Sequence, residues 1–196
     1  MHLLLRDFSH ERLRRNERAY AVSLRMATFY CELAKYYGPR LHGGEGLHEA
    51  DVLNALQVLE QERTNIFAGQ GWARENETRE ARELTRDYID GMMHYFNLRA
   101  NWAEWIEWSE YALAACEQLS DEKAAGAISG NLGIVYRQKG EWDKAIEFYQ
   151  KDLAISERMG DVHGMAQTYN NLGFVYADKG EWDTAIAFYQ QSERTS

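Results

Sequence analysis

The chain has 196 residues, one proline, two cysteines and a formal net charge of −9. The charge is uneven, because residues 1–40 carry eight Lys and Arg against four Asp and Glu, a net of +4, and residues 41–196 carry fourteen against twenty-seven, a net of −13. An acidic body disfavours direct binding to nucleic acid or to an anionic membrane, and the basic head is either a contact for an acidic partner or a solvated helix face.

Residues 1–46 are predicted to form a helical segment that ends in a linker. A stripe at helical spacing predicts one long helix, and the stretch 37–46, YGPRLHGGEG, has the composition of a loop. The stripe consists of Ala19, Val22, Met26, Phe29, Leu33 and Tyr37. Cys31 and Cys116 match no metal or redox spacing and are expected to be buried reduced thiols, which fits a cytoplasmic location. No apolar run approaches the length of a membrane span.

Residues 47–121 are predicted to form degenerate helical repeats. One helix is expected through Val52, Leu59 and Phe67, and the next through Leu84 and Phe96. Residues 96–121 align with residues 136–161, but Met93 and Trp105 stand where the later copies have Gly and Ala. Two large residues at a close contact predict a wider hairpin. Trp102, Trp105 and Trp108 are expected to form a packed core, with a stacking platform for a ligand as the alternative.

The rest of the chain repeats itself at a distance of forty residues. Residues 131–156 and 171–196 share sixteen of twenty-six aligned residues. A fixed period in this range predicts stacked helical hairpins, here 122–161 and a truncated unit 162–196, which bury their apolar stripes against each other. Gly160 is suited to a left-handed helix end. Gly133 with Ala145, and Gly173 with Ala185, are expected to allow a close approach of the two helices in each hairpin.

These residues resemble the tetratricopeptide repeat (TPR) family, and the forty-residue period is similar to its longer-helix branch in signalling scaffolds. The matching positions, which also include the two tryptophans, are Leu132, Gly133, Tyr136, Gly140, Trp142, Ala145 and Tyr149, and again Leu172, Gly173, Tyr176, Gly180, Trp182, Ala185 and Tyr189. The resemblance implies an all-α fold, a right-handed superhelical array of antiparallel hairpins preceded by two to three long N-terminal helices. It also implies a protein–protein interaction module that is not an enzyme.

The front of the chain has a second resemblance, to the sensor arm of NB-ARC or STAND signal-transducing ATPase regulators. The stretches that carry it are MHLLLRDFSHERL at the start, 55–73 and 98–119. The start is similar to the last piece of a winged helix. No phosphate-binding loop of the G-x-x-x-x-G-K-[ST] type occurs in the sequence. A chain that ends at Ser196 is expected to be a truncated product or an excised fragment whose uncapped last hairpin promotes self-association.

The family resemblance places a binding groove on the first helix of each hairpin. An Asn before the Leu-Gly pair offers a donor and an acceptor to a peptide backbone; the alternative is that it bonds the neighbouring helix. The predicted partner-binding residues are Asn131, Asn171, Asn170, Ile134, Arg137, Gln138, Gln167, Phe174, Asp178, His94 and Asn97. No catalytic, metal or cofactor site is predicted. The alternative function is a scaffold that assembles through its uncapped ends, and an enzyme or a DNA-binding regulator is disfavoured.

Overall fold

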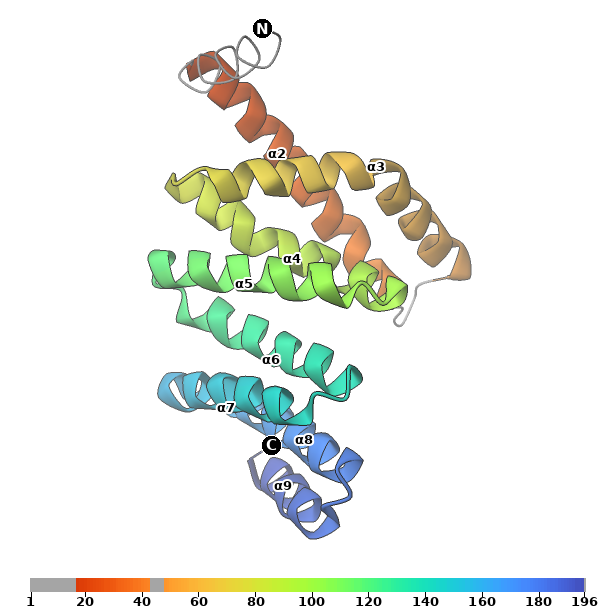
Figure 1. The fold of residues 1–196 in the computed structure, drawn as a ribbon, viewed down its shortest axis with the longest axis vertical. Coiled ribbons are helices and arrows are strands. Elements are labelled where there is room, and N and C mark those ends of the chain that lie inside the picture. The colour runs from red at the N-terminus through yellow and green to blue at the C-terminus, as the bar shows by residue number, and fades with distance from the viewer. Residues whose placement is uncertain (1–16, 43–47, 196) are drawn as a thin grey trace, which may run out of the picture. The chain divides into compact units, whose positions relative to one another are not determined.

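The computed structural model describes residues 17–42 and 48–195. These residues form eight α-helices and one short 3₁₀ helix, with no strand among them, which confirms the predicted all-α fold (Figure 1). The stretch MHLLLRDFSHERL and residues 43–47 of the linker lie outside the described residues. The chain divides into two compact units between Asn101 and Trp102. The four segments predicted from the sequence stay a prediction.

The first unit consists of helices α2 (Glu17–Tyr37), α3 (Glu49–Glu75) and α4 (Arg79–Arg99) with the 3₁₀ helix η1 (Gly38–His42). Each of the three α-helices packs on the other two. The two long helices predicted after residue 47 are confirmed as α3 and α4. The beginning of the predicted linker is wrong, since residues 38–42 form η1 and Gly38 is buried.

Small residues, not the large apolar stripe, make the core face of α2. Ala27, Cys31 and Ala34 are fully buried, whereas Val22 and Phe29 are more than half exposed. The reason is the close approach of glycines on the neighbouring helices. A Cβ at Gly91 would lie 2.7 Å from the backbone of Ala34, so only small side chains fit this face. The stripe expected on α2 was therefore assigned to the wrong face.

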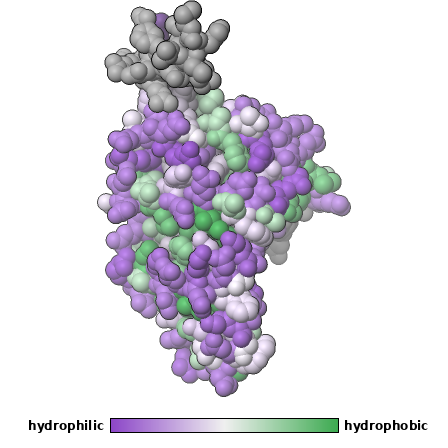
Figure 2. Space-filling view, in the orientation of Figure 1, coloured by the Kyte–Doolittle hydropathy of each residue, from purple (hydrophilic) through white to green (hydrophobic). Residues whose placement is uncertain are grey.

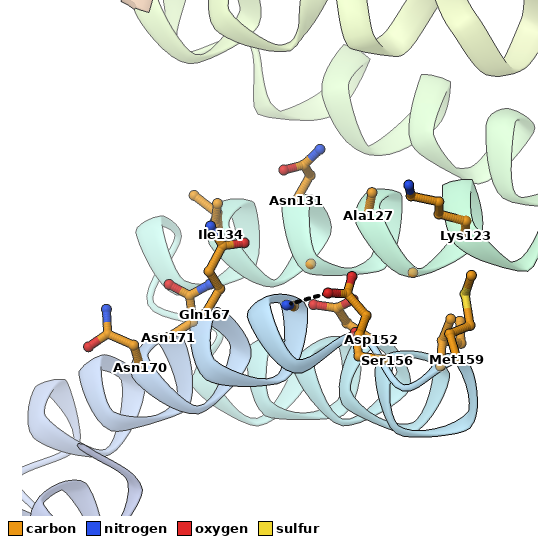
Figure 3. A pocket seen from close by; sticks show the side chains of 15 residues that line it. Lys123, Ala127, Asn131, Ile134, Asp152, Ser156, Met159, Gln167, Asn170 and Asn171 are labelled. Carbon is orange, nitrogen blue, oxygen red and sulfur yellow. Dashed lines mark hydrogen bonds between the residues drawn. The ribbon is translucent and has the colours of Figure 1, made fainter. Parts of the chain in front are cut away.

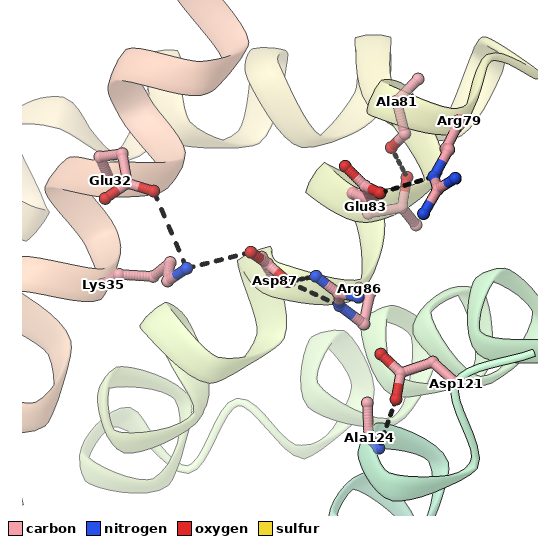
Figure 4. Close-up of polar contacts among 10 residues, drawn as sticks. Glu32, Lys35, Arg79, Ala81, Glu83, Arg86, Asp87, Asp121 and Ala124 are labelled. Atoms are coloured by element: carbon pink, nitrogen blue, oxygen red, sulfur yellow. Dashed lines mark hydrogen bonds and ion pairs between the residues drawn. The ribbon is translucent and has the colours of Figure 1, made fainter. Parts of the chain in front are cut away.

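Polar contacts join α2 to α4 at the edge of this core (Figure 4). The Lys35 ammonium donates to Asp87 at 3.0 Å, and the Arg86 guanidinium bonds the other oxygen of the same carboxylate. Cys31 lies beside this network; burial, followed by the Asp87 charge, raises the pKa of its thiol to about 12. Cys31 and Cys116 are both buried free cysteines, as predicted.

The second unit stacks five helices in chain order (Figure 1). They are α5 (Trp102–Leu119), α6 (Glu122–Gln138), α7 (Trp142–Met159), α8 (Val162–Asp178) and α9 (Trp182–Thr195). Asp121 and Asp161, forty residues apart, cap α6 and α8 with the same side-chain bond to a backbone N–H three residues on. Gly160 has φ +67°, which confirms the predicted left-handed helix end.

Inside each hairpin the glycine of the Leu-Gly pair makes room for an aromatic ring. A Cβ at Gly133 would lie 2.5 Å from the ring of Tyr149, and one at Gly173 would lie 2.4 Å from Tyr189. The glycine is therefore matched to the tyrosine one turn after the alanine, and the expected close approach to Ala145 or Ala185 stays a prediction. Ala145 and Ala185 are nonetheless buried.

The tryptophans divide into buried and exposed sets. Trp105 and Trp108 are buried, as predicted, and Trp102 stacks on Trp105 with ring centroids 6.1 Å apart. Trp142 and Trp182 are not core residues, since 37% and 66% of their surfaces are exposed. Each begins its helix, so its side chain lies at the edge of the hairpin. Met93 and Trp105 lie in different units, and the wider hairpin stays a prediction.

The described surface is mostly polar. Hydrophilic side chains dominate the face shown in Figure 2, and the apolar patches between them are small. Among the described helices, none combines the length and the apolar character that crossing a bilayer requires.

Candidate functional site

A groove of about 510 Å³ lies between α6 and α8, over the C-terminal half of α7 (Figure 3). All of its walls belong to the second unit. The side chains that the sequence supplies at this place are mostly polar or small, with three large apolar ones, Ile134, Ile155 and Met159. The lining consists of Lys123, Gly126, Ala127, Gly130, Asn131, Ile134, Asp152, Ile155, Ser156, Met159, Asp161, Gly164, Gln167, Asn170 and Asn171.

Amide side chains line one end of the groove. Asn131 comes from α6, and Gln167, Asn170 and Asn171 come from the facing α8, with Ile134 as the apolar member of the group (Figure 3). The structure thus brings together five of the eleven residues predicted to bind a partner. Each amide presents a donor and an acceptor, which suits hydrogen bonds to the backbone of an extended chain.

Three further predicted residues lie outside the groove lining and contact one another. The Arg137 guanidinium donates to Asp178 at 2.6 Å across α6 and α8, and it lies 5.0 Å from the centre of the Phe174 ring. Phe174 in turn meets Tyr189 edge to face at 5.7 Å. This cluster links one hairpin to the next. Gln138 is exposed at the last position of α6.

His94 and Asn97 belong to the first unit and lie on α4. The His94 ring lies on the His42 ring, with centroids 5.1 Å apart. Burial, followed by the nearby His42, lowers the pKa of His94. Asn97 is exposed.

Several lining residues were not predicted, because the sequence argument considered only the first helix of each hairpin. Asp152, Ser156 and Met159 come from α7, the second helix, and form the floor of the groove (Figure 3). Lys123, Ala127, Asn131 and Ile134 follow one another on α6 at steps of four, four and three residues. That helical spacing, extended back from Asn131, was the signal that could have found them.

Asp152 is the half-buried charged residue on this floor. One of its oxygens accepts a hydrogen bond from the Thr168 hydroxyl at 2.7 Å. Burial raises the pKa of the carboxyl group, the Thr168 bond acts in the opposite direction, and the Asp161 carboxylate raises it further. Asp161 itself caps α8 by accepting from the Gly164 N–H at 2.9 Å.

Two glycines of α6 face this carboxylate. A Cβ at Gly130 would lie 2.9 Å from one oxygen of Asp152, and a Cβ at Gly126 would lie 3.3 Å from the other. The absence of side chains at these two positions lets the Asp152 carboxylate pack closely against α6. The groove therefore combines an amide-lined end with an acidic floor.

Comparison with known proteins agrees with this architecture. Residues 124–195, which cover α6 to α9, match the family model described as tetratricopeptide repeat. Repeats of this family generally mediate contacts between proteins, and their fold is typically that of a non-enzymatic interaction module.

The fold also resembles a solved structure, the crystal structure of BtubC (BKLC) from P. vanneervenii, with a TM-score of 0.53. The identity is 17%, and the match covers 95% of this chain and 74% of that chain. This likeness concerns the fold alone. A comparison with curated proteins finds no match.

Proposed function

We propose that the groove between α6 and α8 binds an extended segment of a partner protein. The observation that carries this proposal is the set of four amide side chains, Asn131, Gln167, Asn170 and Asn171, on two facing helices of one groove. Amides on both sides can bond the N–H and C=O groups of a chain that lies between them, whatever its sequence. Family membership of residues 124–195 supports a protein partner.

We further propose that the chain is the sensor or scaffold part of a larger signalling or transcriptional regulator in the cytoplasm. The NB-ARC-like stretches 55–73 and 98–119 support this role. The net charge of −13 over residues 41–196 supports a protein partner over nucleic acid or an anionic membrane.

The test is a comparison of three proteins as bait in lysate of the host, with bound proteins quantified by mass spectrometry. The double variant Asn131→Ala/Asn171→Ala removes amides from both walls. Asn54→Ala/Asn65→Ala is the matched control, because both residues are exposed on α3 in the first unit. The groove variant should capture at least about tenfold less of a partner that wild type and the control variant both capture.

Thermal unfolding of each bait shows whether the variants are folded. A groove variant that is folded and captures the same partners as the wild type would contradict the proposal. In that case the partner binds elsewhere on the chain.

A second candidate function is self-association through the last hairpin. Trp182 and Ile186, one turn apart on α9, expose 66% and 52% of their surfaces. Exposed apolar residues on one helix face are typical of a contact surface. Under this candidate, Trp182→Glu or Ile186→Glu should lower the mass measured by light scattering, and the double Asn variant should leave it unchanged. Phe188 is unsuitable for this test, because it stacks on Tyr176 inside the hairpin at 5.3 Å.

A further inference from the structure

The floor of the groove holds a carboxylate that has no positive partner among the residues that the structure describes. Asp152 is half-buried, and in the part of the chain that the structure describes its one hydrogen-bond donor is the neutral Thr168 hydroxyl. The other charge that acts on it is the Asp161 carboxylate, which is also negative. Lys123 lines the groove in the first turn of α6 but forms no ion pair with Asp152 in the described structure.

This arrangement is particular to one hairpin. Forty residues earlier the equivalent of Asp152 is Ala112, which is buried, and forty residues later it is Ser192, which donates to the Ala166 carbonyl. The two glycines that face Asp152 are equally particular, since Gly126 and Gly130 correspond to Ala166 and Asn170 in the next hairpin. A carboxylate packed against two glycines is thus a local feature of this groove and not part of the repeat.

A carboxylate in such a place carries a desolvation cost that a ligand can offset. Water is partly excluded, and no cation among residues 17–42 and 48–195 pairs with the charge. Asp152, Gly126 and Gly130 all line the groove, so a side chain of the ligand can approach the carboxylate from the groove. A guanidinium or an ammonium is the group that would pair with it best.

We propose that Asp152 selects partner segments that carry an Arg or Lys side chain, whose cationic head pairs with the Asp152 carboxylate while the amide residues hold the backbone. This inference rests on the proposed function, since it names the chemical class of the segment that the groove takes. The partner is therefore a basic segment and not an acidic tail.

The experiment selects phage-displayed random twelve-residue peptides on wild type, Asp152→Asn and Asp183→Asn. Asp183 is exposed in the first turn of α9 and outside the groove, so both variants lose one negative charge. General attraction of basic peptides to an acidic protein is thereby the same for the two variants. Wild type and Asp183→Asn should enrich Arg or Lys at one position of the peptide, and Asp152→Asn should not.

A selected peptide and its copy with norleucine in place of the basic residue then give the size of the effect. By calorimetry, the replacement should weaken binding to wild type by about thirtyfold and binding to Asp152→Asn by less than about threefold. Equal enrichment of basic residues on all three proteins, or equal losses in the calorimetry, would overturn the inference.

Two controls separate this inference from the groove proposal. If selected peptides bind wild type and Asn131→Ala/Asn171→Ala equally well, the groove proposal fails and the inference fails with it. If they require the two amides but show no preference for a cation, the groove proposal stands and the inference alone is overturned. If no peptide is enriched on wild type, both fail.

Discussion

Hairpins α6–α7 and α8–α9 share sixteen of twenty-six residues over 131–156 and 171–196, but their second helices are buried to different degrees. Tyr149 on α7 is 1% exposed, whereas Tyr189 on α9 is only half-buried. Helix α7 packs on both α6 and α8, and the main contact of α9 in the described structure is with α8. The interior of a hairpin is therefore set by its own sequence, while the burial of its second helix depends on the helix that follows.

The unequal burial of α7 and α9 should have its largest effect on stability when Tyr149 and Tyr189 are each replaced. Tyr149→Ala should lower the free energy of unfolding by about 4 kcal/mol, because it leaves a cavity in a fully buried site. Tyr189→Ala should cost about half as much, because part of its site is already open to water. Urea denaturation followed by circular dichroism measures both values. The Phe variants, which keep the ring, are the controls, and equal losses for the two Ala variants would contradict the comparison.

Gly133 on α6 and Gly173 on α8 face the rings of Tyr149 and Tyr189, so replacing each glycine also tests how the two hairpins differ in burial. In Gly133→Ala the new Cβ would lie 2.5 Å from the buried ring of Tyr149. The ring has no room to move, so the variant should lose about 2 kcal/mol in spite of the higher helix propensity of Ala. In Gly173→Ala the half-buried Tyr189 can shift, and the loss should be below about 1 kcal/mol. Gly71→Ala, which meets nothing within 4 Å, is the control and should be neutral or stabilising.

The left-handed helix ends before and after residue 122 carry different residues. Gly140, Gly160 and Gly180 have positive φ, and the same conformation falls on Ala100 and Ser120, at φ 52° and 56°. A side chain in this region costs about 1–2 kcal/mol. Ala100→Gly and Ser120→Gly should therefore each raise the free energy of unfolding by about 1 kcal/mol, as measured in urea. Gly160→Ala should lower it by a similar amount, and a neutral result there would show that these turns tolerate a Cβ.

The sequence predicted the parts of the fold that repeat. The forty-residue period identified the hairpins from residue 122 and the left-handed glycine at 160, because each of these features is local and recurs. The core face of α2 was missed. Its large apolar residues were assumed to be buried, but Gly91 of α4 lies against Ala34 and Gly69 of α3 lies against Ala27, so the buried face carries small residues.

Only the part of the candidate site that recurs between the hairpins was predicted from the sequence. Asn131 and Asn171 were found because they recur next to the Leu-Gly pair. Asp152 was missed because its counterparts, Ala112 and Ser192, are different residues, so no repeat pattern points to it. A feature that belongs to one hairpin is visible only when the packing of α6, α7 and α8 is known.

The smallest expected effect concerns this unique residue and depends on pH. Because the folded-state pKa of Asp152 is raised above its ordinary value of 3.8, the stability that its protonated form contributes is fully present below that value and is lost as pH rises through the folded pKa. Asp152→Asn lacks this loss and keeps an oxygen that can accept from Thr168. At pH 7 the variant should be more stable than wild type by less than about 1 kcal/mol, and near pH 3 the two should be alike. Thermal unfolding at both pH values measures the difference. Ser192→Ala on α9 is the control, since it carries no ionisable group and its effect should not vary with pH; a pH-independent effect of Asp152→Asn would show that burial does not perturb this carboxylate.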